Sequence, residues 1–279
     1  MRTIDASLIR DTVARLCVEA NCNLPQDVKA ALEAARAQEP WPLAKGTLEL
    51  LEKNLVAAKA QDMPICQDTG MACVFVELGT DVHIEGDFEA AIHEGVRMGY
   101  GEGYLRKSIV GDPLRRVNTG DNTPAILHLE LVGGDEMTIT VAPKGFGSEN
   151  MTSLHMLKPS VTQEMIEDTI VHAVSTAGSN PCPPVVVGVG LGGDAEQCAI
   201  LAKKALLRPV NERNSDPFYA EMELRLLKKI NALGIGPQGL GGTTTALSVA
   251  INVFPTHIAG LPCCVNLGCH VTRHASCVL

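Results

Sequence analysis

The sequence PICQDTG at residues 64–70 places a thiol, an amide, a carboxylate and a hydroxyl side by side between a proline and a glycine. Because proline and glycine interrupt repeating elements, this stretch is predicted to form a loop. The apolar run ACVFV at residues 72–76 follows and indicates a buried strand that would give the loop a rigid base. The pattern makes Cys66 a candidate metal or cluster ligand, with Gln67 and Asp68 facing whatever binds there.

Upstream of this loop the sequence has helical periodicity. Apolar residues recur at three- and four-residue spacing in segments 5–21, 25–38 and 44–61. The region of about residues 1–62 is therefore predicted to be helical and structural, and about 63–279 to carry the cluster. We expect these parts to form one catalytic domain over residues 1–279.

Downstream of the loop, strand and helix patterns alternate. Strands are predicted at 72–78, 125–132, 137–141, 185–189 and 243–253, and helices at 87–99, 161–177, from about 194 to 207, and 216–232. Residues 133–136 (GGDE) read as a hairpin turn between two of these strands. The expected fold class is α+β: a helical N-terminal region, then mixed α/β segments with a small sheet and a cluster held by loops.

Composition narrows the function classes. Hydrophobic residues make up 46% of the 279 residues, yet no apolar run reaches the roughly 18 residues that a membrane span needs. The net charge of −9 and 3% aromatic content argue against nucleic-acid binding. The start, MRTIDAS, lacks the apolar core of a signal peptide, so we expect a cytoplasmic protein. There the ten cysteines would be reduced, which favours ligation or burial over disulfides.

The cysteines divide by their surroundings. No C-x-x-C pair of the kind typical of zinc sites occurs. Cys66, Cys182 and Cys269 each lie in a stretch flanked by glycine or proline, and three such thiolates would suit an iron–sulfur cluster with one iron not bound by protein. The other cysteines are predicted to be core residues (Cys17, Cys73 and Cys198) or are left undecided (Cys22, Cys263, Cys264 and Cys277).

Three further features bear on ligand binding. The glycine-rich, charged segment 100–123 is predicted to be a long irregular loop, and its Arg106 could grip a carboxylate, although a solvated arginine is the more ordinary interpretation. In KGFGSEN at 144–150, the two glycines would let backbone N–H groups approach an anion, or form an ordinary turn. Gly188, Gly190 and Gly193 match a dinucleotide-binding spacing, but no second strand ending in an acidic residue follows. We interpret these three glycines as a tight turn before a helix.

Taken together, these stretches resemble the alpha subunit of the iron–sulfur hydro-lyases of the class I fumarate hydratase and L(+)-tartrate dehydratase type. The resemblance covers nearly the whole chain. It is carried by ICQDTG at 65–70, LRKS at 105–108, NTGDNTP at 118–124, KGFGSEN at 144–150, CPP at 182–184, the glycine-rich residues 234–242, and GCH at 268–270.

The resemblance implies the roles of the cluster ligands and of the groups beside them. In the family three cysteines hold a 4Fe-4S cluster, and the matching residues are Cys66, Cys182 and Cys269. Gln67 and Asp68 would contact the substrate, with Asp68 close to the hydroxyl that is lost or gained.

The resemblance implies roles for four further residues. By resemblance, Arg106 would bind a substrate carboxylate, and Gly145 and Gly147 would supply backbone donors. His257 would pair with Asp68 as a proton relay. A lone histidine near a strand is more often only a hydrogen-bonded structural residue.

The resemblance also implies a partner. Single-chain members continue into a C-terminal domain that carries the catalytic base, whereas this sequence stops at Leu279. We therefore expect a subunit that is active only with a beta subunit, within a higher oligomer of alpha–beta pairs. The expected reaction is reversible hydration of a C4 dicarboxylate, fumarate to malate, with L(+)-tartrate dehydration as the alternative. A non-enzymatic iron–sulfur redox sensor is the alternative from another class, and a nucleotide-binding protein would be indicated by measurable NAD binding.

Overall fold

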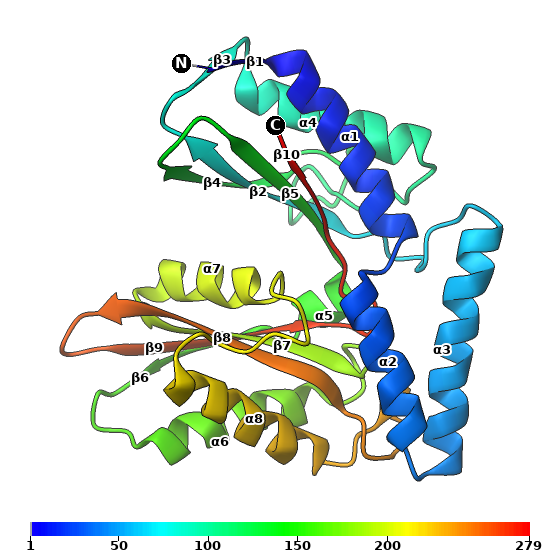
Figure 1. The fold of residues 1–279 in the computed structure, drawn as a ribbon, viewed down its shortest axis with the longest axis vertical. Helices are drawn as coiled ribbons and strands as arrows, with labels where there is room; N and C mark the ends of the chain where they lie inside the picture. Colours follow the sequence, from blue (N-terminus) through cyan, green and yellow to red (C-terminus); the bar gives the residue numbers. More distant parts are fainter. Residues whose placement is uncertain (1) are drawn as a thin grey trace. The chain divides into compact units, whose positions relative to one another are not determined.

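The computed structural model describes residues 2–279, and Figure 1 shows that helices and small sheets alternate along this chain. Two compact units are present. Unit 1 contains residues up to Pro25, Leu55–Phe146 and Arg273–Leu279, and unit 2 contains Gln26–Asn54 and Gly147–Thr272. The α+β class is confirmed. The expectation of one domain stays a prediction, because compactness does not decide whether either unit can fold alone.

Unit 1 is a four-stranded sheet with helices on one face. The strand order is β10-β5-β2-β4, and a parallel pair, β1 with β3, lies apart from it. Its core joins Val74 and Ile139 of the sheet to Ile9 of α1 and Ile92 of α4. The bounds are β1 Arg2–Asp5, α1 Ala6–Cys22, β2 Met71–Gly79, β3 Val82–Glu85, α4 Phe88–Glu102, β4 Ile126–Val132, β5 Met137–Lys144 and β10 Ala275–Val278.

The predicted hairpin between residues 125–132 and 137–141 is wrong. Both strands form, but β2 lies between them, parallel to β4 and antiparallel to β5. The intervening turn crosses the end of β2, where the Gly79 and Asp81 N–H groups donate to the carbonyls of Glu136 and Gly134 (both 2.9 Å). β2 takes the central place because its residues 72–76 are all buried, whereas β4 is largely exposed and suits an edge.

Unit 2 is a sheet covered on both faces, in the order β6-β9-β7-β8. Helices α6 and α8 pack on one face through Ile170 and Leu226, and α7 packs on the other through Cys198 and Ala202 (Figure 1). The bounds are α2 Gln26–Gln38, β6 Ser153–Leu157, α6 Gln163–Ala177, β7 Val185–Gly193, α7 Ala195–Ala205, α8 Pro217–Asn231, the short helix η1 Pro237–Gly239, β8 Ala246–Thr256 and β9 Leu261–Gly268.

Two helices include the boundaries between the units. Helix α3 (Pro42–Ala60) begins in unit 2 and ends in unit 1, and the short α5 (Phe146–Glu149) does the reverse. The three helices predicted within the first 62 residues are confirmed as α1, α2 and α3. No helix within residues 2–279 is long and apolar enough to cross a membrane.

The glycines of the dinucleotide-like spacing have a different role from the one predicted. Gly188 and Gly190 lie inside β7, so the expected turn is wrong for both. A Cβ atom on Gly190 would lie 2.1 Å from the Cys198 carbonyl oxygen of α7, and one on Gly188 would lie 2.2 Å from that of Ala202. The absent side chains therefore allow α7 to pack directly on the strand. Of the three glycines, only Gly193, with a φ of 67°, lies at the end of β7, next to the start of α7.

Candidate functional site

The loop at residues 64–70 leads directly into β2, as predicted, and its backbone is tied down by unit 1. The Tyr100 hydroxyl, on a side chain buried in α4, donates to the carbonyl oxygens of Thr69 (2.7 Å) and Gly70 (3.1 Å). The Asn122 side-chain amide also donates to Gly70 O (3.1 Å). At Gly70, a Cβ atom would lie 2.6 Å from the backbone of Lys144, so the loop passes against β5 where only glycine fits.

Asp68 is held from three directions. Its Oδ1 accepts from Gly70 N (3.1 Å), and its Oδ2 accepts from Phe146 N (3.0 Å). The buried Arg273 guanidinium donates to the backbone carbonyl oxygen of Asp68 (2.7 Å) and also to the side-chain oxygen of Asn21 in α1. A Cβ atom on Gly145 would lie 3.0 Å from Asp68 Oδ2. Unit 1 thus brings Asp68 and Gly145 together, and the carboxylate has a fixed orientation.

The other polar side chains of the loop are more open. Gln67 is exposed, and Cys66 is half-buried with its Sγ donating to Gln67 Oε1 (3.3 Å). A thiol with this accessibility can reach a metal centre, which a core cysteine cannot. Gln67 and Cys66 therefore have the exposure that their predicted roles require.

Arg106 is fixed to the same loop through its backbone. Thr69 Oγ1 accepts from Arg106 N (2.9 Å), and the Asn122 side-chain oxygen accepts from Ser108 N (2.7 Å). Asn122 is fully buried and has a φ of 65°, which is a strained conformation for a residue other than glycine. In this conformation its side chain joins residues 105–108 to Gly70. This network places the base of the exposed Arg106 side chain beside the loop of Asp68.

Sequence reasoning missed the residues that build this network, namely Tyr100, Asn122 and Arg273. Tyr100 looks like any apolar position of an amphipathic helix. The signal available in the sequence for Asn122 was an asparagine between a glycine and a proline, within residues 118–124, because asparagine tolerates a positive φ better than most residues. Nothing in the local sequence distinguishes Arg273.

Unit 2 brings the other two candidate cysteines together. The His270 N–H, next to Cys269, donates to the Cys182 carbonyl oxygen (3.2 Å). Cys182 is exposed and has a φ of 53°, a conformation that costs a non-glycine residue on the order of 1–2 kcal/mol. Strain of this kind is characteristic of sites where a side chain must be aimed.

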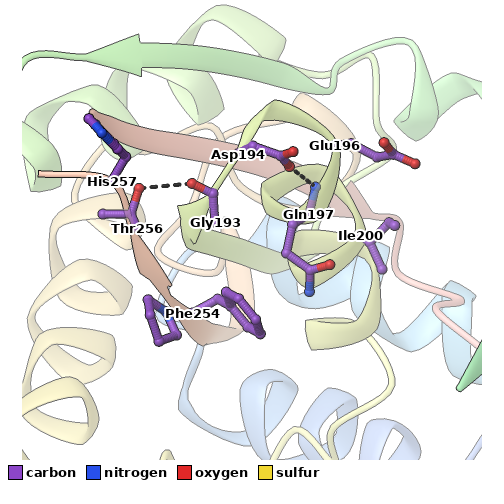
Figure 2. A pocket seen from close by; sticks show the side chains of 9 residues that line it. Gly193, Asp194, Glu196, Gln197, Ile200, Phe254, Thr256 and His257 are labelled. Carbon is purple, nitrogen blue, oxygen red and sulfur yellow. Dashed lines mark hydrogen bonds between the residues drawn. The ribbon is translucent and has the colours of Figure 1, made fainter. Parts of the chain in front are cut away.

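Gly147 and His257 also lie in unit 2. Gly147 is in the short α5, where a Cβ atom would lie 3.4 Å from the Asn180 carbonyl oxygen. His257 follows β8, and its exposed ring accepts from Ala259 N at Nδ1 (3.1 Å). His257 lines an open pocket of about 430 Å³ together with Asp194 and Phe254. Figure 2 shows the side chains that line this pocket. Asp68 belongs to unit 1, so the predicted His257–Asp68 pair stays a prediction.

The chemistry of the cysteines fits a thiolate-bound group at the three predicted positions. Burial raises the thiol pKa to about 12 in Cys17, Cys263 and Cys264, and to about 11 in Cys198. These thiols and the buried Cys73 are core residues, which confirms the prediction for Cys17, Cys73 and Cys198 and assigns two undecided cysteines. Cys66, Cys182 and Cys269 are all at least partly exposed. Cys22 and Cys277 share that exposure, so accessibility alone does not select the ligands.

Within residues 2–279, no three His, Cys, Asp or Glu side chains are already gathered as a metal-binding group. The candidate ligands divide between the units, with Cys66 in unit 1 and the other two in unit 2. The fit to a cluster therefore rests on the donor atoms and their exposure.

Comparison with known proteins decides the family. The family model described as fumarate hydratase (fumerase) matches residues 10–278. The chain belongs to the fumarate hydratase family. Members of this family are hydro-lyases, and the chain is assigned to that class of enzyme.

Two relatives of this fumarate hydratase family member are similar to it over almost their whole length. A Methanocaldococcus jannaschii protein with the provisional name L(+)-tartrate dehydratase subunit alpha is 42% identical over 274 residues, covering 96% of each chain. The L(+)-tartrate dehydratase subunit alpha of Escherichia coli is 31% identical over 272 residues, covering 96% of this chain and 89% of that one. The chain thus spans nearly the full length of relatives that are named as alpha subunits.

Proposed function

We propose that this chain is the cluster-bearing alpha subunit of a two-subunit hydro-lyase that adds water to, or removes water from, a C4 dicarboxylate. The observation that carries this proposal is the fixed Asp68 carboxylate beside Gly145, on a loop tied to Arg106. These loops present a carboxylate, a backbone N–H donor and a guanidinium together. Such groups can bind the hydroxyl and carboxylate groups of a hydroxy diacid.

The proposed cofactor is a 4Fe-4S cluster held by Cys66, Cys182 and Cys269. Bound through three thiolates, such a cluster would supply an iron with an open position, which acts as a Lewis acid toward hydroxyl and carboxylate oxygens. The accessible thiols fit this role. The proposed compartment is the cytoplasm, where cysteine thiols stay reduced and available to bind iron.

In this proposal each residue near the loop has a separate role toward the substrate. Asp68 is oriented by two backbone N–H groups, so its carboxylate can hold or move a proton at the substrate hydroxyl without first reorganising. The Arg106 guanidinium offers paired donors that match one substrate carboxylate. Gln67 is exposed next to Asp68 and can orient a second oxygen. Gly145 and Gly147 would contribute backbone donors, and His257 would exchange a proton with Asp68.

A beta subunit is proposed to complete the site. Removal of a weakly acidic proton next to a carboxylate requires a positioned base and compensation of developing charge. Support for the partner comes from the relatives named as alpha subunits, whose lengths this chain nearly spans. Pairs of alpha and beta subunits are proposed to associate further.

Fumarate is proposed as the first substrate to test, and L(+)-tartrate is supported equally. The family description names fumarate, whereas both relatives are named for tartrate. These reactions differ by one substrate hydroxyl, so the same loop can serve either.

The decisive experiment is an anaerobic assay. This chain, reconstituted with iron and sulfide and combined with its candidate beta subunit, is tested against fumarate, malate, L(+)-tartrate and related diacids. We expect turnover of one C4 diacid by the complex and none by either subunit alone. A chain that binds a full cluster yet never supports turnover with its partner would instead be a redox sensor, and measurable NAD binding would support nucleotide binding.

A further inference from the structure

The glycine-rich stretch at residues 234–242 is tightly packed within unit 2. A Cβ atom on Gly236 would lie 1.8 Å from the Gly241 carbonyl oxygen, and one on Gly239 would lie 2.4 Å from Ser179 Cβ. Both glycines also have positive φ angles, of 69° and 79°. The stretch therefore has one compact conformation, pressed against the segment that leads into Cys182.

A buried carboxylate anchors the end of this stretch. Glu39, only 3% exposed, accepts from Thr243 N (2.9 Å), Thr243 Oγ1 (3.0 Å) and Thr244 Oγ1 (2.9 Å), and from Trp41 N (3.2 Å). A Cβ atom on Gly242 would lie 3.1 Å from Glu39 Oε1. The connection between α2 and α3 thus holds the glycine-rich stretch in place.

Gln238 projects from this anchored stretch onto the two cysteine loops. Its backbone N–H and its side-chain Nε2 both donate to the Pro183 carbonyl oxygen, at 2.7 and 2.8 Å. Its Nε2 also lies 3.2 Å from His270 Nδ1, and that ring nitrogen lies 3.1 Å from the Cys182 carbonyl oxygen. Gln238 has a φ of 55°, so its conformation is strained as well.

These contacts close a ring of three chain segments. Gln238 holds Pro183, Pro183 follows Cys182, and the Cys182 carbonyl accepts from the His270 N–H beside Cys269. We propose that Gln238 is a positioning residue that holds the backbone of Cys182 and His270 in place, so that the thiols of Cys182 and Cys269 are preorganised for the cluster. This inference rests on the proposed function for the cluster itself, but the ring of contacts exists without it.

Preorganisation has a specific consequence. If Gln238 served only general stability, its loss would lower the unfolding temperature and leave the two cysteine loops as ordered as the rest of unit 2. If it positions them, its loss should loosen those loops selectively, because the hydrogen bonds that it makes lie only there. A loosened pair of ligands would also release iron faster.

The test uses three variants of the full chain. Gln238→Leu removes the side-chain donors at similar size, and Gln238→Asn keeps an amide and tolerates the positive φ but is too short to reach Pro183 O. Gln26→Leu, at an exposed glutamine at the start of α2, is the matched control. The first readout is hydrogen exchange of the His270 amide in the metal-free chain, compared with that of the buried Val187 in β7.

We expect the His270 amide to exchange at least about tenfold faster in both Gln238 variants, with Val187 unchanged and Gln26→Leu like wild type. After anaerobic reconstitution, iron loss to a chelator should accelerate by a similar factor. An unchanged His270 amide, or equal acceleration at Val187, would overturn the positioning role. A wild-type chain that binds no cluster would contradict the proposed function, and the exchange comparison would still decide whether Gln238 holds the loops.

Discussion

At the scale of single residues, the candidate site depends on polar groups that are held by backbone N–H groups, both from the same loop and from a distant segment. Asp68 has its two carboxylate oxygens satisfied by Gly70 N and Phe146 N. A carboxylate held in this way loses little entropy when substrate binds, so it can act on a proton in one defined direction.

Asp68→Asn tests this role because it keeps the size of the side chain and one acceptor oxygen while removing the negative charge. We expect cluster content to stay at the wild-type level and turnover by the two-subunit complex to fall by about a hundredfold or more, as is typical for loss of a general acid–base group. Iron analysis and steady-state kinetics measure the two quantities. Turnover within about threefold of wild type would remove Asp68 from the proposed mechanism.

Thiol reactivity provides a test at this scale that does not depend on function. At pH 8 in the metal-free chain, iodoacetamide should modify the exposed Cys182 first. Cys17, Cys263 and Cys264 should react slowest, because burial raises their pKa to about 12 and leaves almost no thiolate at that pH. Mass spectrometry of peptides over time gives the order. Early modification of Cys263 or Cys264 would show that β9 is not buried as described.

At the scale of elements, close approach of helix and strand decides where the site can be built. Strand β7 carries glycines where α7 packs on it. The same strand pairs with β9, which leads to Cys269. The glycine-rich stretch anchored by Glu39 leads into β8. Both ligand loops of unit 2 therefore extend from rigid elements.

Gly190→Ala tests the packing of α7. The added methyl group would lie 2.1 Å from the Cys198 carbonyl oxygen, so the helix must move, and overpacking of this kind costs about 1–3 kcal/mol. Gly46→Ala in α3 is the matched control, because no atom lies within 4 Å of its added Cβ and alanine favours helix by up to about 1 kcal/mol. Urea unfolding should show a loss for the first and no loss for the second; equal stabilities would contradict the described contact.

Glu39→Gln tests the anchor of the glycine-rich stretch. Burial alone would raise the pKa of Glu39, but hydrogen bonds from Thr244, Trp41 and Thr243 outweigh it and lower the pKa below its usual value. A depressed pKa means that the carboxylate stabilises the fold above the pKa of the unfolded chain, about 4.3, and that this contribution is lost as pH falls through the lower folded value.

At pH 7 the free energy of unfolding of the glutamine variant should therefore be about 1–3 kcal/mol lower than that of the wild type, because the amide N–H₂ group of the variant faces other hydrogen-bond donors. This difference should shrink as pH falls through the lowered folded pKa of Glu39, where the wild-type carboxylate becomes protonated. Unfolding curves at a series of pH values measure it. A difference that is constant down to acid pH would mean that the charge of Glu39 does not contribute.

At the scale of the whole molecule, the three predicted cysteine ligands come from both units, and the chain matches its relatives over almost its entire length. A group bound only by the native chain stabilises that state by mass action. Reconstitution with iron and sulfide should therefore raise the unfolding temperature, by about 5 °C if binding contributes a few kcal/mol.

The control for this prediction is a set of single variants. Cys66→Ser, Cys182→Ser and Cys269→Ser should each lose most of the stabilisation, and Cys277→Ser, at a cysteine of similar exposure in β10, should retain it. Anaerobic thermal unfolding monitored by circular dichroism makes the comparison. A ligand variant that is stabilised as much as wild type would exclude that cysteine from the set.

Local pattern in the sequence was sufficient for the elements and for part of the site. Helical periodicity located α1, α2 and α3, and the bounding proline and glycine located the Asp68 loop. Flanking glycines and prolines separated Cys66, Cys182 and Cys269 from Cys17, Cys73 and Cys198, but they left the buried Cys263 and Cys264 undecided. These features depend on residues within a few positions of one another, so they can be read without knowledge of the fold. The same short motifs in combination identified the family.

Only the tertiary structure decided which distant segments meet. It inserted β2 between β4 and β5, because a strand that is apolar on both faces gains most from a central position. It placed Gly188 and Gly190 beneath α7, and it joined Asn122 to Gly70, Arg273 to Asp68 and Gln238 to Pro183. The three hydrogen-bonded pairs link residues that are 52, 205 and 55 positions apart in the sequence. The physical reason is that burial and hydrogen-bond satisfaction are settled by the whole packed unit, whereas periodicity and turn chemistry are settled by neighbours in the chain.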